Sequence, residues 1–309
     1  MKKIRGALAL MLGLSLLACP ALAVNDASQE LDNSAPVAEN QELQTYRGVS
    51  VGGRLKAYDA DGDEFTFEIL TEPMKGTVEL SPDGQFVYTP REGKRGRDYF
   101  GFCAVDSHGA SSQEGTVIIK LVKQKTNLTY SDMSGDPNEY AAVMLTERGV
   151  FTGSTLGSDT VFDPEDSLTR GEFLALCMNA ADVETLAGVR STGFQDDDDI
   201  ADWLKPYVAT ALMQGYIRGY SDEDGPVFRP NEPITLRDAC VMLNAVLGVT
   251  DVVSVGNYFG DTESPAAQSV ANLTAAGVML SRWEDLDAGV TRAQAAEMLQ
   301  NAISLLARR

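Results

Sequence analysis

Apolar and polar residues alternate in short segments along the first part of the chain. In one of them, Phe65, Phe67 and Ile69 are separated by polar residues, and similar segments follow as far as residue 122. A period of two places every apolar side chain on one face of a β-strand. The sequence "SPDGQ" between two segments is a good hairpin turn, because Asp83 and Gly84 tolerate positive φ. The pattern predicts an antiparallel β-sandwich over residues 36–122.

The period becomes helical after residue 130, and the helical pattern occurs three times. Apolar residues stand four, five, seven and eight places after each of Thr169, Thr235 and Thr291, which is one face of a helix. A helical stretch that ends in glycine precedes each pattern. Repetition of this kind indicates stacked modules. We predict an all-α region of three helix, loop, helix units at residues 130–183, 194–248 and 259–306, after a linker at 123–129.

Each of the three helices begins with a threonine cap. In "LTRGE", the Thr169 hydroxyl can accept the third N–H of the helix while Glu172 reaches back to the Thr169 N–H. Weaker forms of this capping box are predicted at two further pairs, Thr235 with Asp238 and Thr291 with Gln294.

The cap does not explain the arginine that follows two of these threonines. Arg170 and Arg292 lie at the positive end of a helix dipole, which costs about 0.3–1 kcal/mol unless an anion is near. The guanidinium donors, beside free helix N–H groups, suit a carboxylate. The alternative is a pair with a neighbouring Asp or Glu. In the second unit Leu236 takes this position and Arg237 follows, about 100° further around the helix.

Composition narrows the classes of partner. The 309 residues include 45 acidic and 25 basic side chains, for a net charge of −20. This charge disfavours binding to nucleic acid or to an anionic membrane, since both need clustered Lys and Arg. A single histidine excludes a His-based metal cluster. Neither a nucleophile elbow, a zinc motif nor a paired-carboxylate setting stands out from the general acidity, so we do not expect an enzyme.

The amino terminus predicts export. Residues 1–23 combine a basic start, a short apolar run and the small-residue site "ALA", which is typical of a cleaved signal peptide. The mature chain would then begin at Val24, with a flexible leader at 24–35 and no transmembrane segment. The alternative is lipidation of Cys19 in "LLAC", which would make the protein a membrane-tethered lipoprotein.

Three cysteines remain after cleavage, an odd number without disulfide or metal spacing. Cys240 stands at the fifth place after its threonine and Cys177 at the eighth, so both fall on the apolar stripe. With Cys103, they are predicted to be buried free thiols.

Acidic residues gather in one turn of the sandwich. Asp59, Asp61 and Asp63, with Asp98 and Asp106 further on, offer oxygen ligands for Ca²⁺. The sequence "DADGDEF" lacks the twelve-residue loop that ends in Glu. The sequence therefore favours a solvated Asp-Gly turn that ends the strands, with a metal site as the alternative.

Two family resemblances add to these predictions. The segments "NSAPVAEN", "AYDADGDEFTFEI", "KGTVELSPDGQFVYTP" and "DYFGFCAVDSHG" resemble bacterial cadherin-like and immunoglobulin-like tandem-repeat modules. Related cadherin-type modules bind Ca²⁺.

The second helical unit, from "FQDDDDIADW" to "EPITLRDACVMLNAVLG", resembles an S-layer homology repeat. The pattern of that family is an aromatic-x-Asp start, then Gly-Ile-x-x-Gly, Phe-x-Pro and a final Thr-Arg-Ala-Glu. The first unit carries "YSD", "FDP" and "LTRGE", and the third carries "FGD" and "VTRAQ".

The second resemblance implies three S-layer homology repeats in a compact pseudo-threefold bundle with grooves between them. It also implies non-covalent attachment to an acidic, pyruvylated secondary cell-wall polysaccharide. Arg170 and Arg292 would contact the glycan carboxylate, while the shifted Arg237 is a weaker candidate. Trp203, before the first helix of its unit, is either a sugar platform or a partly buried packing residue.

Together these features predict a multidomain, non-catalytic protein of the cell wall and cell surface. Its repeats would hold the wall polysaccharide, and the sandwich would be displayed as a spacer or adhesin that meets other surface proteins. Two alternatives stay open: the lipoprotein that links membrane and wall, and a cell-wall hydrolase.

Overall fold

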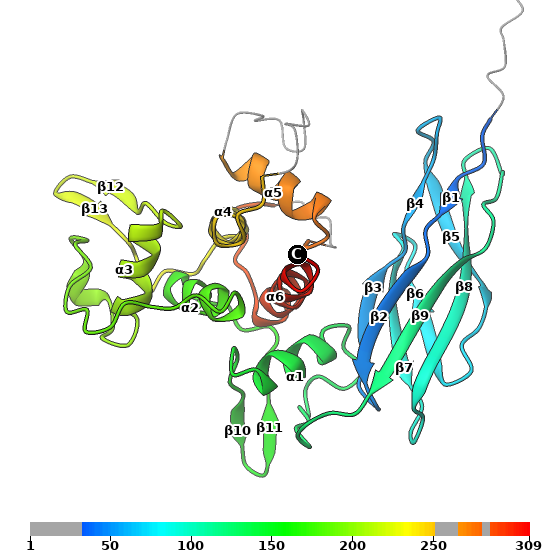
Figure 1. The fold of residues 1–309 in the computed structure, drawn as a ribbon, viewed down its shortest axis with the longest axis horizontal. Coiled ribbons are helices and arrows are strands. Elements are labelled where there is room, and N and C mark those ends of the chain that lie inside the picture. The colour runs from blue at the N-terminus through cyan, green and yellow to red at the C-terminus, as the bar shows by residue number, and fades with distance from the viewer. Residues whose placement is uncertain (1–32, 251–264, 280–284) are drawn as a thin grey trace, which may run out of the picture. The chain divides into compact units, whose positions relative to one another are not determined.

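A β-sandwich forms the amino-terminal part of the described chain (Figure 1). The computed structural model describes residues 33–250, 265–279 and 285–309. One sheet has the strand order β2-β9-β8-β5 and the other β3-β7-β6. The strands are β2 (Gln41–Tyr46), β3 (Val51–Arg54), β5 (Phe65–Thr71), β6 (Gly76–Leu80), β7 (Gln85–Pro90), β8 (Gly96–Asp106) and β9 (Gly115–Val122), with a separate short pair of β1 (Val37–Ala38) and β4 (Ala57–Tyr58).

Strand alternation builds the core of the sandwich, as the period of two predicts. Phe86 and Phe100 are almost fully buried, and their rings meet edge to face with centroids 5.1 Å apart. The turn between β6 and β7 is the predicted one, with Gly84 at a φ of +84°. The strands pair antiparallel except β2, which runs parallel to β9.

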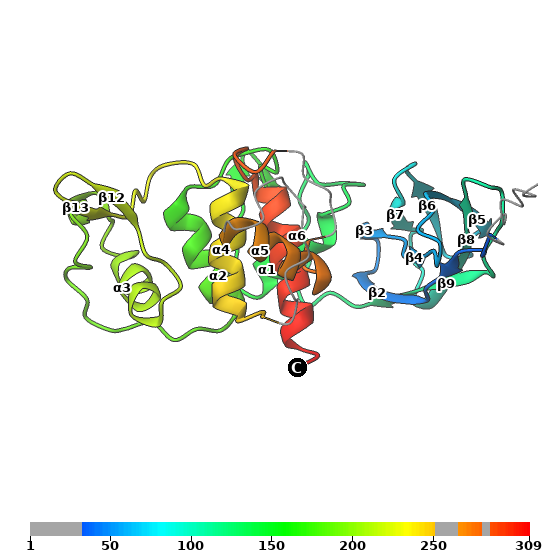
Figure 2. The same ribbon diagram turned by 90° about the horizontal axis from the view of Figure 1, so that it is seen from above.

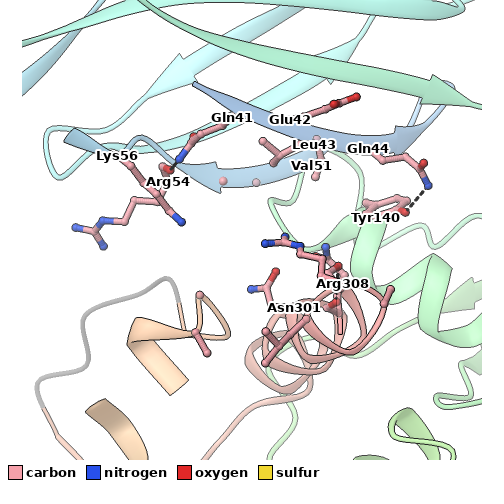
Figure 3. Close-up of a pocket in the computed structure, with 18 of the residues that line it drawn as sticks. Gln41, Glu42, Leu43, Gln44, Val51, Arg54, Lys56, Tyr140, Asn301 and Arg308 are labelled. Atoms are coloured by element: carbon pink, nitrogen blue, oxygen red, sulfur yellow. Dashed lines mark hydrogen bonds between the residues drawn. The ribbon is translucent and has the colours of Figure 1, made fainter. Parts of the chain in front are cut away.

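Polar groups also connect strands of the two sheets. The Gln41 side-chain amide on β2 donates to the Arg54 carbonyl oxygen of β3 over 3.0 Å (Figure 3). Asp98 on β8 is only 3% exposed and accepts the Tyr88 hydroxyl of β7 over 2.8 Å. Burial, followed by this hydrogen bond, raises the pKa of Tyr88. The Tyr88 phenol therefore stays protonated and donates to the carboxylate.

The region after the sandwich is helical but not all-α, which corrects the predicted all-α bundle. Two antiparallel hairpins lie between helices: β10 (Ser154–Leu156) with β11 (Asp159–Val161), and β12 (Tyr220–Asp222) with β13 (Gly225–Val227). Each replaces part of a predicted loop. The helices are α1 (Glu139–Glu147), α2 (Arg170–Ala180), α3 (Lys205–Gln214), α4 (Leu236–Leu247), α5 (Pro265–Ala275) and α6 (Arg292–Leu306), with a short 3₁₀ turn at Asp197–Asp199.

A closed ring of backbone hydrogen bonds joins the segments that precede α2, α4 and α6. The Leu168 N–H donates to the Val290 carbonyl, Val290 to Ile234, and Ile234 back to Leu168, over 2.9–3.1 Å. All three side chains are buried. Figure 2 shows the three helices side by side, in agreement with the contacts of α2 with α4 and α6. Each helix start is thus fixed by the other segments as well as by its own cap.

The same segments also satisfy the first N–H groups of the three helices. In α2, Arg170 donates to the Glu232 carbonyl and Gly171 to the Pro230 carbonyl. The start of α4 donates in the same way to Ala288 and Leu286, and the start of α6 to Asp166 and Pro164. The helix N–H groups that were expected to be free beside each arginine are therefore occupied. Any anion at these sites has to be recognised by the side chains.

An aspartate carboxylate fixes the exit of each hairpin. Asp132 of "YSD" accepts the N–H groups of Phe162 and Asp163, and Asp196 of "FQD" accepts those of Phe228 and Arg229. Asp163 and Arg229 both have left-handed backbone conformations, with φ of 57° and 60°. The repeated aspartate thus holds a strained turn in both units. The corresponding "FGD" of the third unit lies outside the described residues.

The three cysteines of the described chain are free and buried, as predicted. Burial raises the pKa of Cys240 to about 12 and that of Cys177 well above its usual value. Both thiols therefore behave as small apolar side chains at neutral pH. The predicted signal peptide, Cys19 and most of the leader lie outside the described residues. Within the described part of the chain, no helix combines the length and the apolar character that a membrane crossing requires.

Candidate functional site

The Arg170 site lies at the start of α2, against the β12–β13 hairpin. The Arg170 side chain is buried, and its Nη1 donates to Asp238 Oδ2 over 2.7 Å. Its Nε donates to the Phe228 carbonyl oxygen over 3.1 Å. The guanidinium carbon lies 4.5 Å from the centre of the Tyr220 ring. The arginine is thus held by a carboxylate, a carbonyl group and an aromatic face of its own chain.

Tyr220 completes the enclosure of the Asp238 carboxylate. Its hydroxyl donates to Asp238 Oδ2, the oxygen that also accepts from Arg170. Burial, followed by the hydrogen bond to Asp238, raises the pKa of Tyr220 to about 12, so the phenol is protonated at neutral pH. The Arg229 guanidinium lies 4.7 Å from the same ring. Tyr220 therefore stacks against two arginines while it donates to the acid.

The Arg292 site lies at the start of α6, against the exit of the β10–β11 hairpin. The Arg292 Nε donates to the Phe162 carbonyl oxygen over 2.7 Å, and Nη2 donates to the Thr152 carbonyl oxygen over 2.8 Å. The guanidinium carbon lies 4.8 Å from the Phe162 ring centre and 5.2 Å from that of Phe151. Among the described residues, the structure places no carboxylate oxygen within 4.0 Å of Arg292. Its side chain is half-buried.

The Arg237 side chain does not occupy an equivalent site. It forms an exposed ion pair with Asp287, with 2.9 Å between Nε and Oδ1. The side chains are 42% and 71% exposed, and such pairs contribute at most about 1 kcal/mol. The shift by one residue in "TLRD" is thus accompanied by a different direction of the arginine, and Leu236 is buried in its place.

The three threonine caps differ in whether the side chain three residues later accepts a hydrogen bond from the threonine N–H. Each threonine hydroxyl accepts the N–H three residues later. In α2 the Glu172 side chain returns to the Thr169 N–H over 2.9 Å, and in α6 Gln294 returns to Thr291 over 2.8 Å. In α4 the box is not formed, and the Asp238 carboxylate contacts Arg170 instead. Asp238 is the shortest of the three side chains at this position, and it is the one that does not accept the N–H of its own capping threonine.

Trp203 is an exposed side chain rather than a packed one. It is 57% exposed, and its ring meets Tyr207 edge to face with centroids 6.4 Å apart. Its exposure leaves a ring face accessible, which a sugar platform requires. Within the described part of the chain, the rings that lie against Arg170 and Arg292 are those of Tyr220, Phe228, Phe151 and Phe162, and the Trp203 ring is not among them.

The acidic run "DDDDI" is used by the protein itself. Asp196 binds two hairpin N–H groups, as described above, and Asp197 accepts from the Thr192 N–H and hydroxyl and from Lys205 Nζ. These contacts, of which the Thr192 hydroxyl is the largest, lower the pKa of Asp197 to about 2. Among the described residues, Asp198 and Asp199 do not belong to a group of side chains that could hold a metal ion.

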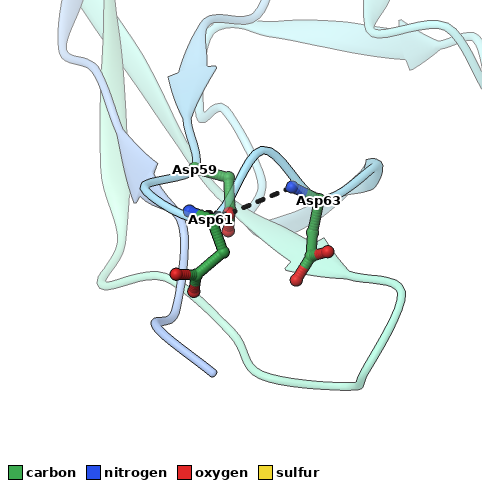
Figure 4. A group of neighbouring side chains, drawn as sticks. All are labelled: Asp59, Asp61 and Asp63. Atoms are coloured by element: carbon green, nitrogen blue, oxygen red, sulfur yellow. Dashed lines mark hydrogen bonds between the residues drawn. The ribbon is translucent and has the colours of Figure 1, made fainter. Parts of the chain in front are cut away.

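Asp59, Asp61 and Asp63 do come together (Figure 4). Each offers a carboxylate oxygen within 4.8 Å of the others. The Asp59 Oδ1 accepts the N–H groups of Asp61 and Asp63, as in an Asp-Gly turn. Asp59 is only 5% exposed, and none of the described residues donates a hydrogen bond to its Oδ2. Asp98 and Asp106 are not part of this group: Asp98 accepts the Tyr88 hydroxyl, and Asp106 Oδ1 accepts the His108 and Ala110 N–H groups in the next turn.

Some functional contacts carry no local sequence signal. The Arg170–Asp238 pair joins residues 68 positions apart, and the Arg292–Thr152 bond joins residues 140 apart. The aromatic rings near the two arginines do have a signal in the sequence, since "FDP" and "FRP" place Phe162 and Phe228 at equivalent positions of two units. That the same phenylalanines also present a carbonyl group to an arginine follows only from the structure.

Two family models match the chain. The bacterial cadherin-like domain matches residues 25–124, and the S-layer homology domain matches residues 193–240. The surface-layer 125 kDa protein of Lysinibacillus sphaericus is 29% identical over 126 residues, which are 40% of this chain and 10% of that protein. Exoglucanase XynX of Acetivibrio thermocellus is 29% identical over 134 residues, or 42% and 12% of the two chains.

A cellulosome-anchoring protein of the same species is 28% identical over 144 residues, which cover 42% of this chain and 30% of that protein. The chain thus spans less than a third of each of these three relatives. Neither matched family is a catalytic domain. The chain therefore contains a bacterial cadherin-like domain followed by an S-layer homology domain.

Proposed function

We propose that this chain is a non-catalytic cell-surface protein, held on the bacterial cell wall by S-layer homology repeats that bind an acidic, pyruvylated secondary cell-wall polysaccharide. The observation that carries the proposal is the S-layer homology match at residues 193–240. It is supported by the names of two relatives, a surface-layer protein and a cellulosome-anchoring protein. An exported location at the cell wall agrees with both.

We extend the S-layer homology assignment to three repeats. The family model covers only the second, but α2, α4 and α6 begin with the same threonine cap and donate their first N–H groups in the same cyclic order. The hairpins β10–β11 and β12–β13 occupy equivalent places in the first two units. These common features favour a pseudo-threefold arrangement of helices with hairpin insertions.

Recognition of the polysaccharide has to be local, because the chain carries a net charge of −20 and the proposed glycan is also anionic. Arg292, which has no carboxylate of the described chain within 4.0 Å, supplies a cation with fork geometry for a ligand carboxylate. The exposed Trp203 ring is a platform for a sugar face. The cadherin-like domain is then displayed as a spacer or as an adhesive module for other surface proteins.

Two other functions are distinguished by direct measurements. A cell-wall hydrolase would cut bonds in purified wall polysaccharide, and the exoglucanase relative shows that such regions occur in proteins named as enzymes. A lipoprotein would carry a diacylated Cys19 at its mature amino terminus, whereas the proposed protein starts with a free Val24. Mass spectrometry of the mature amino terminus distinguishes the lipoprotein from the proposed protein.

We expect the mature chain to co-sediment with purified cell-wall sacculi and to stay in the supernatant once the secondary polymer is stripped from them. Because both partners are acidic, raising the salt concentration from about 10 to about 150 mM screens their repulsion, so binding should stay equal or increase. Sacculi from which only protein was removed are the control. Equal binding before and after polymer removal would contradict the proposal.

A second function of the chain is proposed for the amino-terminal domain: Ca²⁺ binding at the cluster of Asp59, Asp61 and Asp63. The specific observation is the buried Asp59 Oδ2 without a hydrogen-bond partner, beside two further carboxylates. A buried carboxylate oxygen is costly unless it is paired or coordinates a metal. Hard oxygen ligands of this kind suit Ca²⁺, which needs six to eight of them, so backbone carbonyls or water would complete the shell.

Calcium should therefore raise the melting temperature of the sandwich, while the same concentration of Mg²⁺ should have a smaller effect. At 100 times the Kd, a single site adds about 2.7 kcal/mol to the free energy of unfolding. Asp59→Asn should abolish the response, and Asp83→Asn, in an exposed turn outside the cluster, should leave it unchanged. The measurement is differential scanning calorimetry with chelator as reference, and an identical response of parent and Asp59→Asn would disprove the site.

A further inference from the structure

The Arg170 and Arg292 sites share one plan. Each arginine is the first residue of a helix that follows a threonine cap. Each Nε donates to the carbonyl oxygen of a buried phenylalanine, Phe228 or Phe162, and each guanidinium carbon lies near that ring, at 5.4 and 4.8 Å. Both sites are thus built to hold a guanidinium group in a fixed direction.

The two sites differ in what faces the remaining donors of the guanidinium. At Arg170, Nη1 donates to Asp238 Oδ2, and the side chain is only 6% exposed. At Arg292, the described residues provide carbonyl partners for Nε and Nη2 only, and none of them accepts a hydrogen bond from Nη1. An arginine whose charge is met only by carbonyl groups and rings retains an attraction for a carboxylate.

A difference of one methylene group explains why only one site holds its own acid. Asp238 and Glu172 are both the third residue of their helices. The longer Glu172 returns to the Thr169 N–H and stays in its capping box, so it does not reach toward Arg292. The shorter Asp238 leaves its own box incomplete and contacts the arginine of the adjacent unit.

The first residues of the two hairpins reinforce this difference. Tyr220 begins β12, and its hydroxyl and ring enclose the Asp238 carboxylate and the Arg170 guanidinium. The equivalent residue at the start of β10 is Ser154, which is exposed and has no ring to cover Arg292. One site is therefore closed by two side chains that the other lacks.

We propose that Asp238 is a built-in carboxylate that occupies the Arg170 site, so that the acidic group of the wall polysaccharide binds at the Arg292 site. This inference rests on the proposed function. The closed site can be opened: removing the Asp238 carboxylate leaves a buried guanidinium without a counter-charge, which destabilises the protein unless an external carboxylate replaces it. Asp238 thus determines how many of these sites accept ligand.

The first experiment tests the closed site without the polysaccharide. The melting temperature of the full mature chain is measured in sodium pyruvate and in sodium chloride of equal ionic strength. Asp238→Ala should melt below the parent in chloride and recover in pyruvate, with a gain clearly larger than that of the parent. Glu42→Ala, which removes one carboxylate beside Lys120 in the sandwich, is the matched control and should show no such recovery. Equal gains of Asp238→Ala and Glu42→Ala would overturn the proposal.

The second experiment tests the consequence for wall binding. Arg292→Ala should weaken co-sedimentation with sacculi about tenfold or more. Adding Asp238→Ala to Arg292→Ala should restore part of that loss, because the Arg170 site becomes available, whereas adding Glu42→Ala should not. A folded double variant that binds no better than Arg292→Ala alone would overturn the proposal. If Asp238→Ala does not fold, Asp238→Asn keeps the shape of the side chain without its charge and serves in both experiments.

The two experiments also separate this inference from the proposed function. Failure of the parent chain to bind sacculi contradicts the wall-binding function, and the pyruvate experiment still decides whether Asp238 occupies a carboxylate site. Binding of the parent that is unaffected by Arg292→Ala contradicts the assignment of the open site, while wall binding itself stands.

Discussion

Replacing Phe162 by alanine is expected to lower the free energy of unfolding of the helical region by about 3–5 kcal/mol, the usual cost of a large cavity in a packed core. Phe162 is fully buried, and its ring packs against Tyr130 and Phe151 with centroids 5.3 and 5.2 Å away. The same ring lies under the Arg292 guanidinium. The folded fraction of the variant should therefore also bind sacculi more weakly, because the arginine loses its support.

Urea unfolding, monitored by hydrogen exchange of peptides from α2 and α6, measures this loss of stability in the helical region. Leu156→Ala is the control in the neighbouring hairpin: Leu156 is 72% exposed, and the substitution should change stability by no more than about 0.5 kcal/mol. Phe162→Leu, which keeps much of the volume, should cost less than Phe162→Ala. Similar values for Phe162→Ala and Leu156→Ala would show that the ring does not support this core.

Replacing Asp98 by alanine is expected to destabilise the sandwich by about 3–5 kcal/mol, because three donors, among them the buried Tyr88 hydroxyl, lose their acceptor at once. The Asp98 carboxylate accepts the N–H of Met74 over 3.1 Å, the N–H of Lys75 over 2.7 Å and the Tyr88 hydroxyl over 2.8 Å. It thereby fixes the turn between β5 and β6 to strands β7 and β8.

Tyr88→Phe provides the comparison, since it removes one of these donors and keeps the ring. Its cost should be about 0.5–1.5 kcal/mol, the net contribution of a single hydrogen bond. Both values come from urea unfolding monitored by hydrogen exchange of β6, β7 and β8 peptides. A loss in Asp98→Ala no larger than that in Tyr88→Phe would mean that water or another group replaces the carboxylate.

The sandwich and the helix starts could be predicted from sequence because their signals are local. Alternation in Phe65–Ile69 follows from one buried face of a strand, and the Thr169 cap involves residues three positions apart. The hairpins were missed for the opposite reason. All three residues of β10, Ser154–Leu156, are exposed, so no apolar face imposes a period on them.

The difference between the two arginine sites also could not be predicted from one unit. The phrases "LTRGE" and "VTRAQ" suggest that Arg170 and Arg292 are alike. Their surroundings are supplied by other units: Asp238 and Tyr220 for one, Thr152 and the Phe162 carbonyl for the other. A motif identifies the residue, but the charge that faces it depends on contacts between units.

The ring of hydrogen bonds among Leu168, Ile234 and Val290 has a consequence for the order of folding. Each of the three segments receives from one neighbour and donates to the other, so a pair of them leaves donors and acceptors without partners. The segment that contains Val290 is the last of the three to be synthesised. Native contacts of the first two units are therefore complete only after the third has arrived, and contacts of such long sequence separation form slowly. We expect the helical region to fold as a single cooperative unit, unlike open repeat arrays that propagate from one module to the next.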